Sequence, residues 1–263
     1  MNNAIVLTDG LLMTSDAKAA HGLIRGTERF NIIGLVDGEA NAGKDAGFLL
    51  DGKHRGIPVF ATMDAAIEAL EKVDYLIIGV ATVGGRLPKN MLALIYDAVK
   101  KGISVVNGLH EYLNEKADLV DIAASTGAQL IDVRKPKSRA DLHFWDGAIF
   151  NVTAPIVAVI GMDCAMGKRT TARMLKQACN AEEMKAEMIY TGQTGWLQGG
   201  KYGFIFDSTL NDFVSGELEH AIVSCWKETQ PDILFLEGQS SLRNPSGPCG
   251  LELLISVTQN MWF

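Results

Sequence analysis

The sequence has 263 residues, of which 48% are hydrophobic and 21% are charged, as suits a globular chain of two ordinary domains or one large α/β domain. Its formal net charge of −7 and pI of about 5.3 argue against non-specific binding to nucleic acid or anionic membranes, although a local basic pocket is compatible with both values. Its four cysteines lack the CxxC spacing of a zinc site. No run approaches the ~18–20 apolar residues of a membrane-spanning helix, and no secretory signal is visible. We therefore expect a soluble, cytoplasmic protein.

Short apolar runs alternate with helix-like segments through the first half of the chain. Runs rich in Val, Ile and Leu predict buried strands of a parallel sheet at 4–8, 31–37, 74–81, 103–108 and 128–133. The spacing of apolar residues predicts amphipathic helices at 16–29, 63–72, 88–101 and 115–126. Alternating strands and helices form βαβ units, so we expect an α/β domain with a Rossmann-like, doubly wound sheet over residues 1–150.

The pattern restarts after a segment rich in prolines and charges, residues 134–155, which we interpret as a linker. The second half predicts strands at 156–160, 187–191 and 232–236, and helices at 168–181 and 210–228. Residues 151–263 are therefore expected to form a P-loop-like α/β domain. Three strands are few for such a domain, so we expect a C-terminus that is either shortened relative to relatives or completed by a partner subunit. We also expect a homo-oligomer.

The first predicted domain lacks the G-x-G-x-x-G fingerprint of dinucleotide binding after its first strand. Asp37 stands where a ribose-binding acid would lie, but an Asp at a strand end is more often a turn former. We therefore do not favour NAD as a ligand.

Cationic residues in the first half form a candidate anion site. Lys18, His21 and Arg25 are spaced i, i+3, i+7, so they share one helix face that suits a carboxylate or phosphate, with a solvated basic stripe as the alternative. Arg86 and His110 follow strands at the carboxyl edge, where open α/β sheets place ligands.

The segment "GMDCAMGKRT" (161–170) lies between a predicted strand and a predicted helix, as a phosphate-binding loop does. Five residues separate its two glycines, one more than in the common loop, and an arginine stands where a hydroxyl is expected. A threonine hydroxyl follows, displaced from the usual magnesium position. The predicted anion-binding residues are Gly161, Asp163, Gly167, Lys168, Arg169, Thr170 and Thr171.

Polar residues follow other strands of the second half. Glu237 ends an apolar strand, where phosphate-loop proteins hold metal, water or substrate, although such an acid is commonly structural. Gln193 lies in a Gly-rich loop and is a candidate donor to substrate, and Asp207 is a candidate metal ligand. Cys164 has no base at a fixed short spacing, so we interpret it as a bystander.

The loop spacing resembles that of the dethiobiotin synthetase and cobyrinic acid amidase group. A broader resemblance rests on "KAAHGLIR", "GVATVGGRLP", "GLHEYL", "DVRKP", "GMDCAMGKRTTA", "TGQTGW", "NDFVSGELEH" and "LEGQSSL", in that order. This set is similar to a bacterial family that joins a Rossmann-like domain to a P-loop domain, includes a D-glutamate N-acetyltransferase and sometimes carries an NAD-dependent epimerase label. The resemblance implies acetyl-CoA as co-substrate, since a phosphate loop can hold its phosphates without hydrolysing anything, and Arg169 pairs well with phosphate.

Two functional hypotheses follow. In the first, an N-acyltransferase moves an acetyl group from acetyl-CoA to the amine of a small amino acid, by resemblance D-glutamate. Glu237, His110 or His21 acts as base and Lys18, Arg25 or Arg86 anchors the carboxylates.

In the second, a kinase or ligase uses ATP with magnesium, with Lys168 and Thr170 or Thr171 at the phosphates and metal, and Asp207 and Glu237 as metal ligands. A nucleotide-sensing protein without catalysis is a third possibility.

Overall fold

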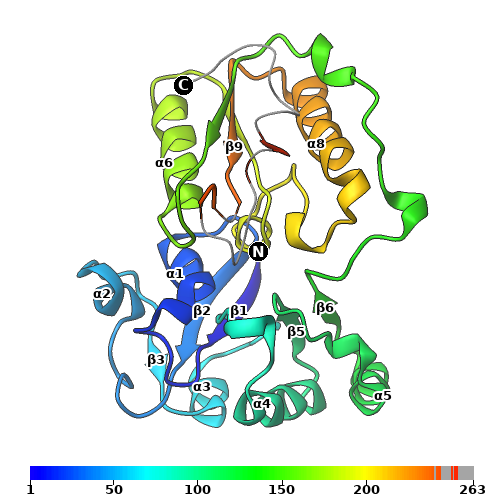
Figure 1. The fold of residues 1–263 in the computed structure, drawn as a ribbon. Helices are drawn as coiled ribbons and strands as arrows, with labels where there is room; N and C mark the ends of the chain where they lie inside the picture. The colour runs from blue at the N-terminus through cyan, green and yellow to red at the C-terminus, as the bar shows by residue number, and fades with distance from the viewer. Residues whose placement is uncertain (240, 244–249, 251, 254–263) are drawn as a thin grey trace. The chain divides into compact units, whose positions relative to one another are not determined.

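The protein is described by a computed structural model that covers residues 1–239, 241–243, 250 and 252–253. The chain forms two compact units, each with its own parallel sheet (Figure 1). The first unit comprises Met1–Lys135 with Leu197–Gly199, and the second comprises Pro136–Trp196 with Gly200–Phe263. The expectations for Cys249 and for the C-terminal end fall outside the described residues.

The sheet of the first unit has six parallel strands in the order β3-β2-β1-β4-β5-β6. Strands β2 and β3 are thus added on one side of β1, and strands β4 to β6 on its other side, as in doubly wound Rossmann-like folds. This order confirms the predicted fold class. The strands are β1 (Asn2–Leu7), β2 (Phe30–Val36), β3 (Val59–Phe60), β4 (Tyr75–Ile78), β5 (Ser104–Asn107) and β6 (Leu130–Asp132). The helices are α1 (Lys18–Arg25), α2 (Ala46–Asp51), α3 (Met63–Ala69), α4 (Lys89–Lys100) and α5 (Ala117–Thr126).

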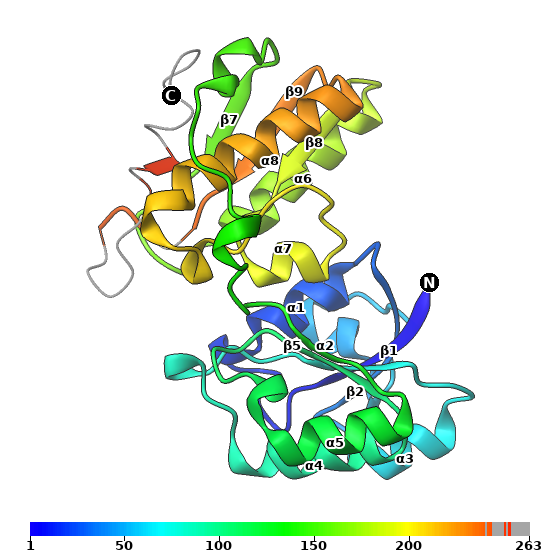
Figure 2. The ribbon, with the colours of Figure 1, turned by 90° about the vertical axis from the view of Figure 1, so that its right-hand side faces the viewer.

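Helices cover both faces of this sheet, with α1 on one side and α4 and α5 on the other (Figure 2). Ile5 and Leu7 of β1 pack in one core cluster with Met91 of α4. Val6 points the other way, because successive strand side chains alternate between faces. A Cβ at Gly79 would lie 2.5 Å from Val6 and 2.9 Å from Ala20, so this glycine lets α1 approach the sheet closely.

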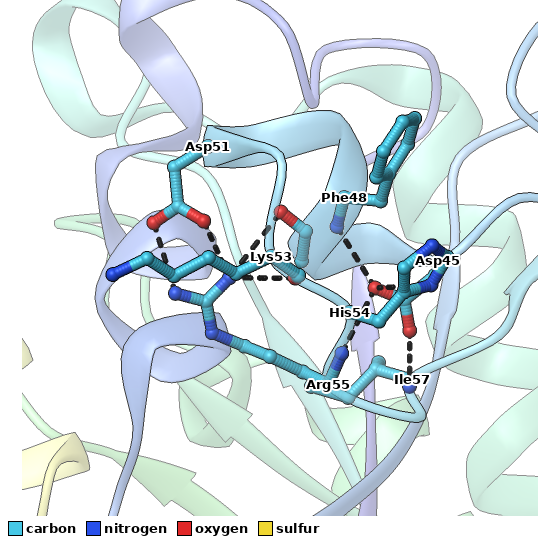
Figure 3. Close-up of polar contacts among 8 residues, drawn as sticks. Asp45, Phe48, Asp51, Lys53, His54, Arg55 and Ile57 are labelled. Carbon is cyan, nitrogen blue, oxygen red and sulfur yellow. Dashed lines mark hydrogen bonds and ion pairs between the residues drawn. The ribbon is translucent and has the colours of Figure 1, made fainter.

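The excursion between β2 and β3 carries α2, which hydrophobic spacing does not indicate. Asp45 accepts hydrogen bonds from the backbone N–H groups of Phe48, Arg55 and Ile57 at 2.8, 3.1 and 2.9 Å (Figure 3). The Arg55 guanidinium donates to both carboxylate oxygens of Asp51 at 2.7 and 2.9 Å. The hydrogen bonds of Asp45 and Arg55 to nearby residues therefore define α2, rather than the burial of an apolar helix face.

The second unit has a three-stranded parallel sheet in the order β7-β9-β8, which confirms the P-loop-like α/β prediction for this half. Its strands are β7 (Ile156–Val159), β8 (Ala186–Ile189) and β9 (Ile233–Glu237), and its helices are α6 (Lys168–Ala181), α7 (Gln193–Leu197) and α8 (Val214–Thr229). Alternation along β9 sends Phe235 into the cluster that contains Ala172 of α6, and Leu234 into the cluster that contains Leu218 of α8. Helices α6 and α8 therefore cover opposite faces (Figure 1).

The predicted linker is attached to α8 rather than extended between the units. Buried Glu217 of α8 accepts hydrogen bonds from Lys137 Nζ at 2.6 Å and from the backbone N–H of His143 at 2.9 Å. Buried Glu219 accepts from the backbone N–H groups of Asp146 and Ile149 at 2.8 and 3.0 Å. The structure thus assigns residues 136–151, called the connecting segment below, to the second unit.

Candidate functional site

The segment from Gly161 to Gly167 forms a tight loop between β7 and α6. Ala165 and Gly167 have φ values of 57° and 91°, in the left-handed region that L side chains rarely adopt. The Lys168 ammonium turns back to donate a hydrogen bond to the Asp163 carbonyl at 2.8 Å. Its side chain passes Gly161 so closely that a Cβ there would lie 3.3 Å from the Lys168 methylenes. The backbone conformation therefore favours glycine at position 167, and at position 161 the lack of a side chain leaves room for Lys168.

This loop has the features of an anion cradle. Residues 162–167 are exposed, and α6 begins directly after them with its first intrahelical bond from Thr171 N–H to Gly167 O at 2.8 Å. The backbone N–H groups of a helix's first turn and its dipole favour negative charge at that end. Lys168 and Arg169 add two positive side chains at the same end. The predicted residues Gly161, Asp163, Lys168 and Arg169 are thus gathered at one helix terminus, with Thr170 and Thr171 on its first turn.

Glu237 ends β9 beside this loop, because its strand pairs with β7 in the register Val159↔Glu237. Only 5% of its surface is exposed. Its Oε2 accepts a hydrogen bond from the Thr191 N–H at 3.1 Å, and its carbonyl accepts one from the Thr191 hydroxyl at 2.8 Å. The side chain is therefore fixed between the loop after β7 and the loop after β8.

Burial raises the pKa of Glu237 to about 7, against the lowering effects of Arg169, the Thr191 N–H and Lys168. A buried carboxylate loses hydration that these groups only partly replace. The result is a carboxyl that exchanges a proton near neutral pH, which is the property of a general acid or base.

The Gly-rich loop after β8 packs directly on Glu237 and Tyr190. A Cβ at Gly195 would lie 2.7 Å from Glu237 Oε2 and would overlap the Tyr190 side chain. Gln193, a predicted substrate donor, is buried in this loop with 6% exposure. The glycines of "TGQTGW" thus allow the loop to enclose the carboxyl, which explains its burial.

The first unit places the predicted cations at two separate positions. On α1, Lys18 and Arg25 are exposed, and His21 Nε2 contacts the Leu12 carbonyl at 2.6 Å. A carbonyl only accepts, so His21 Nε2 carries the proton in this contact. The helix is shorter than predicted and ends at Arg25, because Gly26 has a φ of 134°.

His110 and exposed Arg86 lie near Gly85, whose carbonyl accepts hydrogen bonds from the N–H groups of His110 and Glu111 at 3.0 and 3.1 Å. A Cβ at Gly85 would overlap the His110 ring. Arg134 Nη1 lies 2.8 Å from His110 Nε2, and because a guanidinium only donates, this nitrogen accepts. Arg134 was not identified from the sequence.

Asp37 belongs to the fold rather than to a ribose site. Its Oδ1 accepts hydrogen bonds from the Thr8 hydroxyl at 2.6 Å and from the N–H groups of Gly10 and Leu12 at 3.1 and 2.9 Å. Its Oδ2 accepts from Asn41 at 2.7 Å. The carboxylate thus organises the loop after β1, in agreement with the turn-forming interpretation.

Asp207, the predicted metal ligand, is exposed in a short 3-10 turn (Phe206–Ser208). In the part of the chain that the structure describes, no three His, Cys, Asp or Glu side chains converge as a metal-ion cluster. The same residues contain no helix long and apolar enough to cross a bilayer.

The residues of "GELEH" on α8 make structural contacts that their sequence does not reveal. A Cβ at Gly216 would overlap the His143 carbonyl, so the connecting segment contacts α8 at this glycine. Glu217 Oε1 contacts His143 Nδ1 at 2.9 Å, and the His143 and His220 rings stack with centroids 3.4 Å apart. Burial opposes ionisation of Glu217, but the bonds from Lys137 and His143 outweigh it and hold the pKa below its ordinary value.

Comparisons with known proteins agree with this architecture. The family model described as "Domain of unknown function (DUF1611_N) Rossmann-like domain" matches residues 39–136, and "Domain of unknown function (DUF1611_C) P-loop domain" matches residues 143–260. The crystal structure of a DUF1611 family protein from Anabaena variabilis has a TM-score of 0.87 and 30% identity, covering 98% of this chain and 72% of that one.

Two curated relatives are named D-glutamate N-acetyltransferase. The Pseudoalteromonas protein is 32% identical over 170 residues, which are 65% of this chain and 49% of the relative. The Tritonibacter scottomollicae protein is 32% identical over 145 residues, which are 55% of this chain and 42% of the relative. The chain thus spans about half the length of the curated relatives it matches.

Proposed function

The chain belongs to the DUF1611 family, and we propose that it is an N-acyltransferase that moves an acetyl group from acetyl-CoA to the amine of a small amino acid, with D-glutamate as the first substrate to test. The observation that carries this proposal is a buried carboxyl, Glu237, with a pKa of about 7 beside a phosphate cradle that bears Arg169 in place of a hydroxyl. The names of the two curated relatives support the choice of reaction.

Each part of the site has a role in this reaction. The loop from Gly161 to Gly167, with Lys168 and Arg169, binds the phosphates of the donor, whose thioester supplies the acetyl group. Glu237 accepts a proton from the amine, which must lose it before it can attack a carbonyl carbon. Lys18, Arg25 and Arg86 remain candidate anchors for the substrate carboxylates.

We favour Glu237 over the two histidines as base, because burial raises its pKa to about 7 beside the phosphate loop. His21 Nε2 already donates to the Leu12 carbonyl, and His110 Nε2 already accepts from Arg134. A general base of the usual strength contributes about 10²–10⁴-fold to the rate. We therefore expect replacement of Glu237 to remove most of the turnover and replacement of either histidine to remove less.

The test is release of the free thiol from acetyl-CoA in the presence of D- and L-amino acids, with Lys168→Ala as control. Turnover with at least one amino acid, reduced in the control, supports the proposal. An absence of thiol release with every amine contradicts it.

The ATP- and magnesium-dependent alternative rests on the Thr170 and Thr171 hydroxyls, which lie on the first turn of α6 near the usual metal-binding position. The two hypotheses differ in the ligand that stabilises the protein. Acetyl-CoA should raise the melting temperature without magnesium. Stabilisation by Mg-ATP alone would favour the kinase or ligase.

A further inference from the structure

The connecting segment is held on α8 at two neighbouring points, each built on a buried glutamate of the helix. At the first point, Glu217 accepts hydrogen bonds from the backbone N–H and from Nδ1 of His143, both at 2.9 Å. At the second point, Glu219 accepts from the backbone N–H groups of Asp146 and Ile149 at 2.8 and 3.0 Å. A histidine side chain therefore takes part in the first point, whereas the bonds to Glu219 come from backbone amides.

The histidine of the first point also lies against a histidine of α8. The His143 and His220 rings stack with their centroids 3.4 Å apart and their planes 10° from parallel. A carboxylate only accepts, so His143 Nδ1 carries the proton that it shares with Glu217. The His143 side chain is 44% exposed and His220 is exposed, so both rings exchange protons with the solvent. Two protonated rings at this distance would repel each other.

The surroundings of His220 disfavour a proton on its ring. Burial is the largest cause that lowers the pKa of His220 below its ordinary value of 6.5, and nearby His143 is the next. Lys137 of the connecting segment and Lys227 of α8 act in the same direction, while Glu217 opposes them. His220 thus binds a proton more weakly in the stack than after the rings separate. Acid therefore favours separation, and this effect begins as the pH falls below 6.5.

We propose that the stack of His143 on His220 is a pH-sensitive latch that holds the first part of the connecting segment on α8 at neutral pH and releases it in mild acid. The contacts of Glu219 involve no histidine, so the second point stays closed when the first opens. The switch is local, because it separates two exposed rings and leaves the core of the unit intact. This inference does not depend on the proposed acyl transfer, since all its groups belong to the connecting segment and α8.

The test is hydrogen exchange of single backbone amides between pH 5 and pH 8, with protection factors corrected for the intrinsic effect of pH on exchange. The His143 N–H reports on the latch, and the N–H groups of Asp146 and Ile149 serve as references in the same segment. Protection of the His143 amide should fall about 5-fold or more from pH 8 to pH 5, the factor that repulsion between unit charges about 4 Å apart gives in water. Protection of the two reference amides should change by less than about 2-fold. Glu217 stays ionised over this range, because its pKa lies below its ordinary value of 4.5.

Two variants of His220 move the latch in opposite directions. His220→Phe keeps a ring in the stack that takes no proton, so protection of the His143 amide should not depend on pH. His220→Lys places a positive charge beside His143, so that amide should be poorly protected at every pH. His54→Phe makes the same replacement at an exposed histidine of the first unit and should follow wild type.

Three results would overturn this inference. The first is protection of the His143 amide that is independent of pH in wild type. The second is a His220→Phe variant that still loses this protection in acid. The third is a parallel loss at the His143, Asp146 and Ile149 amides, which would indicate unfolding of the whole segment instead of a latch.

Discussion

Glu237→Gln should stabilise the second unit at alkaline pH while it removes activity. In the folded protein the pKa of Glu237 is raised from its ordinary 4.5 to about 7, chiefly by burial. The folded state therefore binds this proton more tightly than the unfolded state does between these two values. Stability contributed by the protonated carboxyl is fully present below 4.5 and is lost as the pH rises through 7. Glutamine has the same shape and carries no charge, so it avoids that loss.

The magnitude follows from the two pKa values. Raising the pKa of one buried group from 4.5 to about 7 corresponds to roughly 3 kcal/mol once the carboxyl is fully ionised. Part of this stabilisation is already lost at pH 5. The free energy of unfolding of Glu237→Gln relative to wild type should therefore grow by about 2–3 kcal/mol from pH 5 to pH 8. For a unit of this size that is about 5–10 °C in melting temperature.

The assay is thermal unfolding of wild type and Glu237→Gln at half-unit steps between pH 5 and pH 8. Glu182→Gln, an exposed acid that follows α6, serves as the matched control. The melting temperature of Glu237→Gln should exceed that of wild type increasingly as the pH rises, while the control stays parallel to wild type. A difference that is constant with pH would refute the assignment of a neutral-range pKa to this carboxyl.

Three further substitutions test other parts of the account. Lys168→Ala should raise the Kd for acetyl-CoA by about 10-fold or more in calorimetric titration, because a charged donor to phosphate is lost, and an unchanged Kd would contradict the phosphate cradle. Gly216→Ala should lower stability by about 1–3 kcal/mol, since its Cβ overlaps the His143 carbonyl, and hydrogen exchange in the connecting segment should rise with it. Glu217→Gln should lower the melting temperature at pH 7, and this difference from wild type should shrink as the pH falls below 4.5, because the stabilising carboxylate has a lowered pKa and loses its charge in acid. A difference that does not depend on pH would contradict the ion pairs with Lys137 and His143.

The parallel sheets could be predicted because most of their strands are continuous apolar runs. Strand β3 was missed because it has only two residues, which pair with Leu35 and Val36 at the sheet edge. Helix α2 was missed because Asp45 and Arg55 define it by polar bonds that leave no hydrophobic period. Strand β3 is too short to show a pattern, and helix α2 is determined by local hydrogen bonds.

The phosphate loop was visible from its glycine spacing and its position between strand and helix. Glu237 could be predicted as a site residue from its position at a strand end. Its burial could not be predicted, because the burial depends on the packing of the Thr191–Gly195 loop against it. The attachment of the connecting segment was also hidden, since Glu217 and Glu219 bind residues 70 to 74 positions earlier. Contacts at such separation leave no pattern in a single sequence.

The most direct test of the account is mass spectrometry of the products from isotopically labelled acetyl-CoA and D-glutamate, with no nucleotide or magnesium present. The account predicts one labelled acetyl group on the amine for each thiol released, and about 100-fold less product with Glu237→Gln. Label that stays on the donor with every amino acid, or product that forms only with Mg-ATP, would contradict it.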